Sequence, residues 1–252
     1  KELQTQDYVG GAAIVAAHVA ALGGLCTFVS VVGQDEPAEF ARESLTAFGV
    51  VPDLIVDNSR PTTFKTRYLV ENRKMFRISR LKEHSISTLI EDQLINKIQE
   101  LAPNLDGIVV SDFVYGVVTP RTLDVLQSIS RSYNIPLFGD LQCSSQIGNI
   151  LKFKDFRLIC PTEREARIAL SNYDDGVEYI ANLLLKHTHT TNLIMKLGAN
   201  GFIAYEGVQH GEFIRRQHYP ALIANPVDVT GAGDSLLATA SMGLVKGLSL
   251  VE

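Results

Sequence analysis

Segments in which apolar residues recur with a helical period alternate along the chain with short, continuous apolar runs. One set of segments has the period and composition of helices, at 10–22, 36–48, 89–101, 121–133, 163–170, 177–186 and 231–246. Short apolar runs typical of buried strands lie between them, at 25–33, 107–113, 135–140, 156–160 and 192–198. Strands that alternate with helices predict a mainly parallel sheet covered by helices on both faces.

Two regions depart from this alternation and predict paired antiparallel strands. Residues 62–70 and 75–79 alternate polar and apolar side chains around a short polar turn at 71–74, which is typical of a hairpin. Because an isolated strand pair is only marginally stable, we expect this hairpin to lie over the main body as a lid or small sheet. Residues 202–206 and 209–214 predict a second antiparallel pair near the end of the sheet.

Composition and charge narrow the class of protein. The chain has 252 residues, 46% of them hydrophobic, and a net charge of -5, so no overall attraction to nucleic acid or anionic lipid is expected. The scattered cysteines Cys26, Cys143 and Cys160 form no metal or disulfide pattern, which favours a reducing, cytoplasmic setting. No segment has the build of a signal peptide or of a membrane span. Both ends look cut, so we expect a fragment of a longer α/β protein.

The strongest chemical signal is the glycine-rich run Asp228-Val229-Thr230-Gly231-Ala232-Gly233-Asp234, which leads into an apolar helix. Glycines allow a tight turn and a close approach of a ligand, while the amides of the first helical turn and the helix dipole favour an anion. Asp234 is expected beside these donors with a lowered pKa, as a weak base that orients a hydroxyl during phosphoryl transfer. The alternative is an ordinary glycine-rich helix start, in which Asp234 is only a favourable N-terminal charge.

The run DVTGAGD resembles the C-terminal signature of the PfkB (ribokinase-like) carbohydrate kinases. The segments GGAAIVAAHVAALGG, VVGQDEPAEF, SDFVYG, PTERE and MKLGANG follow in the order of that family. The resemblance implies a ribokinase-like three-layer α/β/α fold, a single kinase domain over 1–252 and a β-hairpin lid at about 61–80. It further implies a sugar or sugar-phosphate substrate, ATP and Mg²⁺ as cofactors, Asp234 as catalytic base, and an anion hole at Gly231, Ala232 and Gly233.

The same resemblance assigns roles to other residues, each with an ordinary structural alternative. Backbone turns and an acid would bind the sugar, at Gly10, Gly11 and Asp112. The nucleotide would contact Thr162, Lys196, Gly198, Gly201, Asp228 and Thr230. Glu165 would act on magnesium through water. The alternatives are a helix start for the PTERE segment, a plain turn for the KLGANG segment, and a buried capping role for Asp112.

The hairpin adds a cationic face. Alternation places Lys65 and Arg67 on one side, with Arg77 and Arg80 on or just after the second strand. The segments RPTTFKTRY and MFRISRL most resemble the heptose-7-phosphate kinases, including the kinase half of the bifunctional heptose kinase/adenylyltransferase, which implies that this face clasps a phosphate on the sugar. The alternative is a solvated edge strand protected by charge. The resemblance also suggests a homodimer through the lid.

Several departures from the family pattern keep a second function open. Ile14 stands where many members have an asparagine that binds sugar, Thr162 replaces the usual asparagine, and Tyr115 replaces the usual lysine. A catalytically inactive module that binds nucleotide or sugar phosphate is therefore the alternative. A Rossmann-type dehydrogenase is poorly supported, because GxGxxG is absent after any predicted strand.

Overall fold

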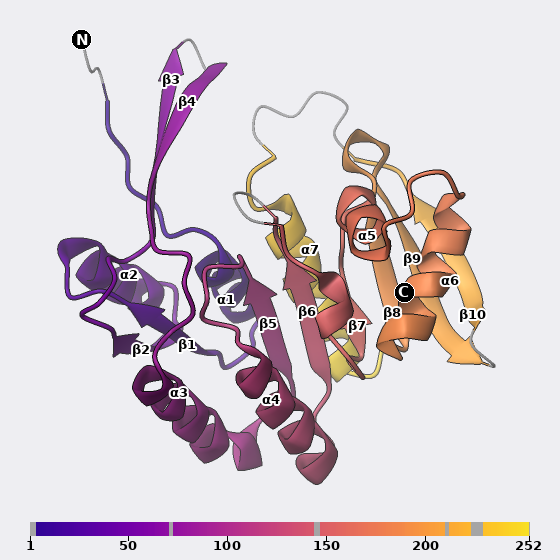
Figure 1. Ribbon diagram of the computed structural model, residues 1–252, viewed down its shortest axis with the longest axis horizontal. Helices are drawn as coiled ribbons and strands as arrows, with labels where there is room; N and C mark the ends of the chain where they lie inside the picture. The colour runs from indigo at the N-terminus through magenta and orange to yellow at the C-terminus, as the bar shows by residue number, and fades with distance from the viewer. Residues whose placement is uncertain (1–3, 71–72, 144–146, 210–211, 223–228, 252) are drawn as a thin grey trace.

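A computed structural model describes residues 4–70, 73–143, 147–209, 212–222 and 229–251, and its centre is a six-stranded sheet (Figure 1). The strand order is β10-β9-β8-β7-β6-β5. The strands are β5 (Ile108–Asp112), β6 (Leu137–Leu141), β7 (Leu158–Ile159), β8 (Asn192–Lys196), β9 (Phe202–Gln209) and β10 (Glu212–Tyr219). Strands β5 to β8 are parallel and β9 and β10 pair antiparallel, as predicted, although the strands of the antiparallel pair extend further along the chain than the predicted 202–206 and 209–214.

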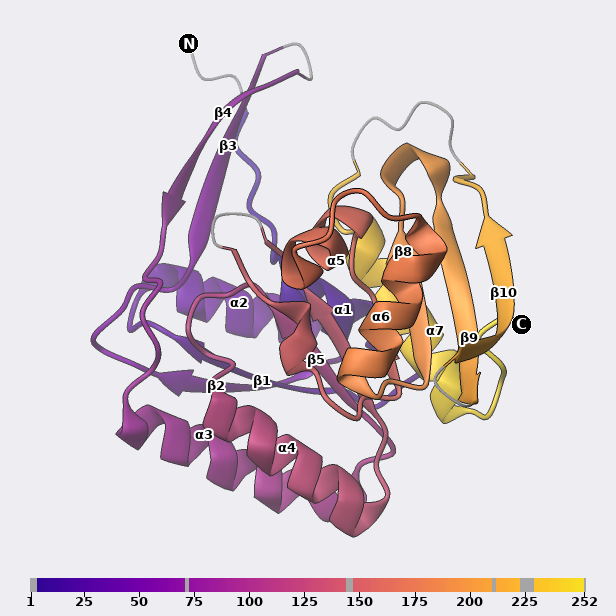
Figure 2. The same ribbon diagram turned by 45° about the vertical axis from the view of Figure 1, so that its right-hand side comes forward.

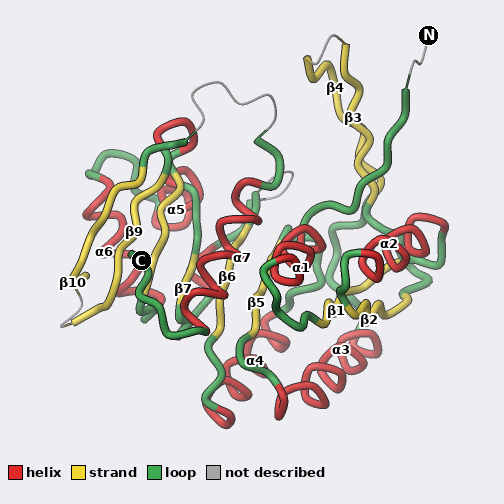
Figure 3. Tube along the Cα trace, turned by 180° about the vertical axis from the view of Figure 1, so that it is seen from behind, coloured by secondary structure: helices red, strands yellow, loops and turns green. Residues whose placement is uncertain are grey.

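Helices cover both faces of this sheet, as the alternation of elements predicted (Figures 2 and 3). One face packs against α4 (Pro120–Tyr133), α5 (Glu163–Leu170) and α6 (Val177–Thr188), and the other against α1 (Ala12–Ala21) and α7 (Ala232–Val245). Successive side chains of a strand point to opposite faces, so Leu137 packs with the first group and Phe138 with the second. By the same alternation, the charged side chains of β6 and β8 point to the face covered by α7.

A separate parallel pair, β1 (Thr27–Val32) and β2 (Val51–Val56), extends the layered arrangement. Helix α2 (Glu36–Ala47) packs on one side of it and α3 (Thr88–Leu101) on the other. The sequence analysis did not predict β2. Its second and third residues are Pro52 and Asp53, which are uncommon in strands, and β2 accommodates them because, among the described strands, it pairs with β1 alone.

The predicted hairpin consists of β3 (Phe64–Val70) and β4 (Arg73–Arg80) and projects from the body (Figure 1). Residues directly opposite in an antiparallel pair share a face. One face therefore carries the pairs Phe64/Arg80, Thr66/Ile78 and Tyr68/Phe76, and the other carries Lys65/Ser79 and Arg67/Arg77. The first face is mostly apolar and the second mostly cationic, and Lys65 and Arg67 share a face as predicted.

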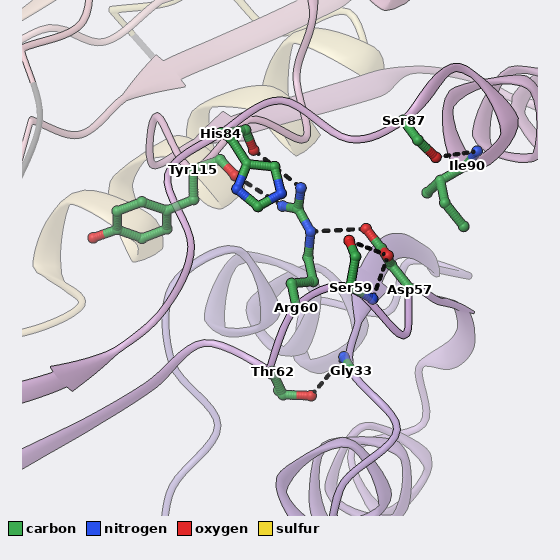
Figure 4. A network of polar contacts seen from close by, with 9 residues as sticks. All are labelled: Gly33, Asp57, Ser59, Arg60, Thr62, His84, Ser87, Ile90 and Tyr115. Atoms are coloured by element: carbon green, nitrogen blue, oxygen red, sulfur yellow. Dashed lines mark hydrogen bonds and ion pairs between the residues drawn. The ribbon is translucent and has the colours of Figure 1, made fainter.

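A buried arginine fastens the base of this hairpin to the body (Figure 4). Arg60 donates from Nε to Asp57 Oδ2 at 2.9 Å, from Nη1 to the carbonyl of Tyr115 at 3.1 Å, and from Nη2 to the carbonyl of His84 at 3.0 Å. These contacts join the end of β2, the segment after β4 and the turn after β5. The entry to β3 is held separately, because the amide of Gly33 donates to Thr62 Oγ1 at 2.9 Å.

No helix in the described part of the chain is long and apolar enough to span a membrane.

Candidate active site

The glycine run forms a turn that delivers Asp234 into the first turn of α7. Gly231 caps the helix with a φ of 85°, in the left-handed region that favours glycine. The Ala232 amide donates to the carbonyl of Val229 at 3.2 Å, and no side chain caps α7 among the described residues. Asp234 itself is buried, with 5% of its surface exposed. Asp228, which the resemblance linked to the nucleotide, lies outside the described residues.

The prediction that Asp234 has a lowered pKa is wrong. Burial raises the pKa of this carboxyl above its ordinary value, and the Gln142 hydrogen bond, Lys196 and His18 offset the increase only in part. A helix start, whose dipole lowers the pKa of a nearby carboxyl, is visible in the sequence, whereas the depth at which the side chain is buried is not. A raised pKa makes the carboxylate a better proton acceptor than predicted.

A buried ion pair, which was not predicted from the sequence, lies beneath the glycine turn. Lys196 Nζ is 2.9 Å from Asp140 Oδ1 and 2.8 Å from Oδ2. A methyl group added at Gly233 would lie 3.4 Å from Lys196 Nζ, so the pair directly underlies the turn. Burial raises the pKa of Asp140 to about 6, although Lys196 opposes this. Burial alone would lower the pKa of Lys196, but the Asp140 carboxylate raises it.

This location gives Lys196 a different partner from the one suggested by the resemblance. Strand alternation directs Lys196 of β8 and Asp140 of β6 to the face covered by α7, where Ile194 and Phe138 also pack. The ammonium therefore lies under the turn in an ion pair. Its predicted contact with a nucleotide stays a prediction.

Gln142 lies just past the end of β6 and reaches Asp234. Its Nε2 donates to Asp234 Oδ1 at 2.7 Å, across 92 positions of sequence. Its backbone amide donates to the carbonyl of Asp112 at 2.8 Å, which fixes the glutamine against the end of β5. No sequence signal pointed to Gln142, because the contact depends on how β6 and α7 meet in space.

Glu165 lies in the first turn of α5 and forms a capping box with Thr162. Thr162 Oγ1 accepts from the Glu165 amide at 3.2 Å, and Glu165 Oε2 accepts from the Thr162 amide at 2.8 Å. Glu165 Oε1 accepts from the Cys143 amide at 3.1 Å. The helix-start alternative for these two residues is therefore realised. Since each carboxylate oxygen has a second lone pair, this arrangement is compatible with a water-mediated role.

The other end of the site joins the hairpin to the turn before α1. Lys65 Nζ lies 5.6 Å from the centre of the Phe113 ring and 5.0 Å from that of Tyr115. Two carbons of the Phe113 ring lie 3.1 Å from where a side chain at Gly11 would begin, so glycine leaves room for that ring. Gly11 has a φ of 58° and caps α1. The structure thus brings Lys65 and Gly11 together across an aromatic platform.

Asp112 and Ile14 have partners that the sequence did not indicate. Asp112 is buried, forms an ion pair with Lys152, and accepts from the Val114 amide at 2.8 Å. A lysine from a distant turn thus stands beside this acid, although Tyr115 occupies the position of the family lysine. Ile14 lies against the glycine turn, 3.6 Å from where a side chain at Gly231 would begin.

The remaining predicted positions belong to turns and to the hairpin. Gly198 and Gly201 form a short turn between β8 and β9, where a side chain at Gly201 would lie 2.0 Å from the carbonyl of Tyr219. Close packing alone therefore requires glycine at position 201. Arg67 and Thr230 are exposed, and the space beside Gly10 is open. Roles for these residues in binding stay predictions.

Among the residues that the structure describes, no group of three or more His, Cys, Asp or Glu side chains could hold a metal ion. The carboxylates of Asp140, Glu165 and Asp234 nevertheless lie close enough to affect one another, since the latter two raise the pKa of Asp140. Mg²⁺ usually keeps several waters and is held by one or two carboxylates together with substrate phosphates. The residues present fit that mode of binding and do not fit a metal cage made only of protein.

A family model described as "pfkB family carbohydrate kinase" matches residues 1–252. The "Bifunctional protein HldE" of Trichlorobacter lovleyi is 32% identical over 248 residues, which cover 97% of this chain and 49% of that protein. The protein of the same name from Geotalea uraniireducens is 31% identical over the same shares. The chain thus spans about half the length of the curated relatives it matches.

Solved structures with low sequence identity share the fold. Phosphofructokinase-2 from Escherichia coli, in complex with substrates and products, superposes with a TM-score of 0.78 at 16% identity, over 100% of this chain and 81% of that one. Ribokinase from Giardia lamblia gives a TM-score of 0.72 at 14% identity, over 93% of this chain and 72% of that one. The predicted ribokinase-like fold is confirmed.

Proposed function

Because the chain belongs to the pfkB family of carbohydrate kinases, we propose that it transfers the γ-phosphate of ATP to a hydroxyl of a sugar or sugar phosphate. The observation that carries this proposal is the buried Asp234 in the first turn of α7, directly after the left-handed Gly231. This arrangement sets a carboxylate beside the positive end of a helix dipole, where both a phosphate and the hydroxyl that attacks it would be stabilised.

The chemistry requires little more than orientation and charge stabilisation. The substrate hydroxyl oxygen forms a bond to the γ-phosphorus, the bond from that phosphorus to the β-phosphate bridging oxygen breaks, and ADP leaves. The hydroxyl proton passes to Asp234. The transition state is loose, so this proton is lost late and a carboxylate is a sufficient acceptor. The anion hole would comprise the backbone around Gly231, Ala232 and Gly233, where the Ala232 amide, which donates to the Val229 carbonyl in this structure, would exchange that partner for the phosphate.

Magnesium would be held mainly by the nucleotide phosphates and water, with Glu165 acting through water as the resemblance implies. When bound, this ion would neutralise charge on the phosphates. Glu165 suits the role because two backbone amides, from Thr162 and Cys143, hold its carboxylate in place. Nucleotide contacts at Gly198, Gly201 and Thr230 are part of the proposal and rest on the family resemblance.

The cationic face of the hairpin favours a substrate that already carries a phosphate. Arg67 lies directly opposite Arg77, and Lys65 lies on the same face. Like charges directly opposite in a sheet repel each other, and an anion between them relieves that repulsion. Lys65 extends over Phe113 and Tyr115, toward the sugar site expected at Gly11. Heptose 7-phosphate is therefore the substrate that we propose, in line with the resemblance to heptose-7-phosphate kinases.

The opposite face of the hairpin favours a second copy of the chain as partner. Tyr68 and Phe76 stack with ring centres 4.5 Å apart and are 44% and 58% exposed, and Ile78 beside them is 54% exposed. An exposed apolar patch of this kind typically marks an interface. A homodimer through the hairpin would bury it. The three free cysteines fit the reducing cytoplasm that we propose as the location.

The test is ADP release measured over a panel of free and phosphorylated sugars that includes heptose 7-phosphate. We expect ADP with at least one sugar phosphate, and a loss of about a thousandfold or more in kcat for Asp234→Asn with nucleotide binding retained. Asp124→Asn, an exposed change on α4, serves as the matched control and should leave kcat unchanged. An inactive binding module would instead shift its melting temperature with ligand and release no ADP with any sugar.

A further inference from the structure

The carboxylate of Asp234 is oriented by a neighbour from another element. Gln142 Nε2 donates to Asp234 Oδ1 at 2.7 Å, while the Gln142 backbone amide donates to the carbonyl of Asp112 at 2.8 Å. The glutamine is thus fixed at its backbone by the end of β5 and bonds α7 through its side chain. An anchored donor of this kind restricts the rotation of the carboxylate that it binds.

The other groups around Asp234 act through charge. Lys196 from β8 and His18 from α1 both favour the ionised form of Asp234, and Asp140 from β6 lies beside Lys196. Lys196 places its ammonium against both oxygens of Asp140. Charge at a distance stabilises a carboxylate but does not select one of its two oxygens. The hydrogen bond from Gln142 does select one, because it engages Oδ1.

We propose that Gln142 is a positioning residue, whose side-chain amide holds Oδ1 of Asp234 so that Oδ2 faces the substrate hydroxyl. The inference rests on the proposed function, since it assigns Asp234 the role of proton acceptor. Gln142 does not touch the reacting atoms. It keeps the acceptor oxygen in the orientation that transfer requires, and small errors in such orientation are costly.

A neutral donor also sets the proton affinity of the base. The hydrogen bond from Gln142 lowers the pKa of Asp234, against the increase caused by burial. Removing the donor should therefore raise that pKa further, and replacing it with a cation should lower it. Asp234 must be ionised to accept a proton, so the acid limb of the pH profile of kcat should move in the same direction as its pKa.

The test compares Gln142→Met, which has similar length and no donor, with Gln142→Lys, which keeps a donor and adds a charge. For Gln142→Met we expect kcat to fall about tenfold to hundredfold with KM nearly unchanged, and the acid limb to move to higher pH. For Gln142→Lys the acid limb should move to lower pH. Gln127→Met is the matched control, because Gln127 is also half-buried and donates to a backbone carbonyl, that of Lys154, far from the site.

An NMR titration of the Asp234 carboxyl carbon in the unliganded variants separates this proposal from the proposed function. Opposite displacements of the Asp234 pKa in the Met and Lys variants would support the contact even if no sugar released ADP. Equal pKa values in wild type and both variants would overturn the inference, as would an unchanged kcat and acid limb in Gln142→Met. In that outcome, ADP release that depends on Asp234 would leave the proposed function standing.

Discussion

The carboxyl edge of the sheet and the hairpin differ in how far their side chains are buried and in what those side chains contact. At the sheet edge, Asp140 has no exposed surface and Asp234 only 5%, and their polar atoms meet charged or hydrogen-bonding partners within the chain. On the hairpin, Phe76 and Tyr68 leave about half of their surface exposed and stack on each other. The edge pairs these buried groups within the chain, whereas the hairpin leaves its aromatic side chains exposed to solvent.

The two regions therefore carry different unfavourable features: buried charge at the sheet edge and exposed apolar surface on the hairpin. Even paired charges lose solvation when they are buried, and the close contacts between Asp140 and Lys196 offset that loss beneath the turn that we assign to catalysis. Exposed apolar residues weaken solubility, which is consistent with the proposed interface on this face of the hairpin. The two regions should therefore respond differently to mutation: the edge through folding, and the hairpin through association and substrate affinity.

The largest expected effect comes from breaking the buried pair. Lys196→Met leaves the Asp140 carboxylate buried without its partner, and we expect the free energy of unfolding to fall by about 3–5 kcal/mol at about pH 8. With Lys196 present, burial raises the pKa of folded Asp140 to about 6; without the opposing effect of Lys196 the pKa should rise further, so ionisation of Asp140 costs the variant more stability than the wild type as pH rises. The loss should therefore shrink toward about pH 5, where Asp140 is protonated. Urea unfolding at both pH values measures it.

A surface lysine is the matched control for this change. Lys97 contacts Asp53 at 3.1 Å and Glu100 at 3.0 Å, and all three side chains are partly exposed to solvent. Lys97→Met should cost far less stability than Lys196→Met, because solvent screens the exposed pairs, and the loss should show little dependence on pH. Equal losses for the two lysine variants would mean that burial does not distinguish the sheet edge from the surface.

The next effect tests the hairpin as an interface. Tyr68→Ser combined with Phe76→Ser should leave the unfolding free energy of the monomer within about 0.5 kcal/mol, because both rings are largely exposed. Self-association, measured by analytical ultracentrifugation, should weaken by at least about 2 kcal/mol. Tyr173→Ser removes an aromatic ring that is 65% exposed elsewhere and should leave association unchanged. A wild-type chain that stays monomeric at high concentration would contradict the proposed dimer.

Much of the fold could be predicted, because apolar periodicity and turn residues report on local structure. The helix at 163–170 was predicted with the bounds it has, since Thr162 and Glu165 form a capping box that is visible in the sequence. The strand β2 was missed because Pro52 and Asp53 argue against a strand, and only its place beside β1 makes them acceptable. Local propensity cannot reveal that partner.

The site was less predictable, because its contacts join distant strands. The glycine run located Asp234, but Gln142, Asp140 and Lys152 gave no signal, since each meets its partner only where sheet strands and loops converge. The pKa of Asp234 was predicted in the wrong direction for the same reason. A helix start is readable from sequence, whereas the depth of burial of its side chain depends on every element packed around it.

The hairpin and the sheet edge meet at Lys65, where we expect a mutation to have a small effect. Lys65 belongs to the hairpin but extends over the Phe113 and Tyr115 rings of the body. Lys65→Met should raise KM for a phosphorylated sugar about tenfold, equivalent to about 1.4 kcal/mol, because one cation near the phosphate is lost. In Lys65→Met, kcat and the KM for ATP should change little. Lys82→Met, at an exposed lysine just beyond β4, should change neither kcat nor the KM for either substrate. An equal rise in KM for the free and the phosphorylated sugar would show that Lys65 supports the sugar ring or the hairpin itself. Steady-state kinetics on both sugars therefore tests whether the cationic face binds the phosphate of the substrate.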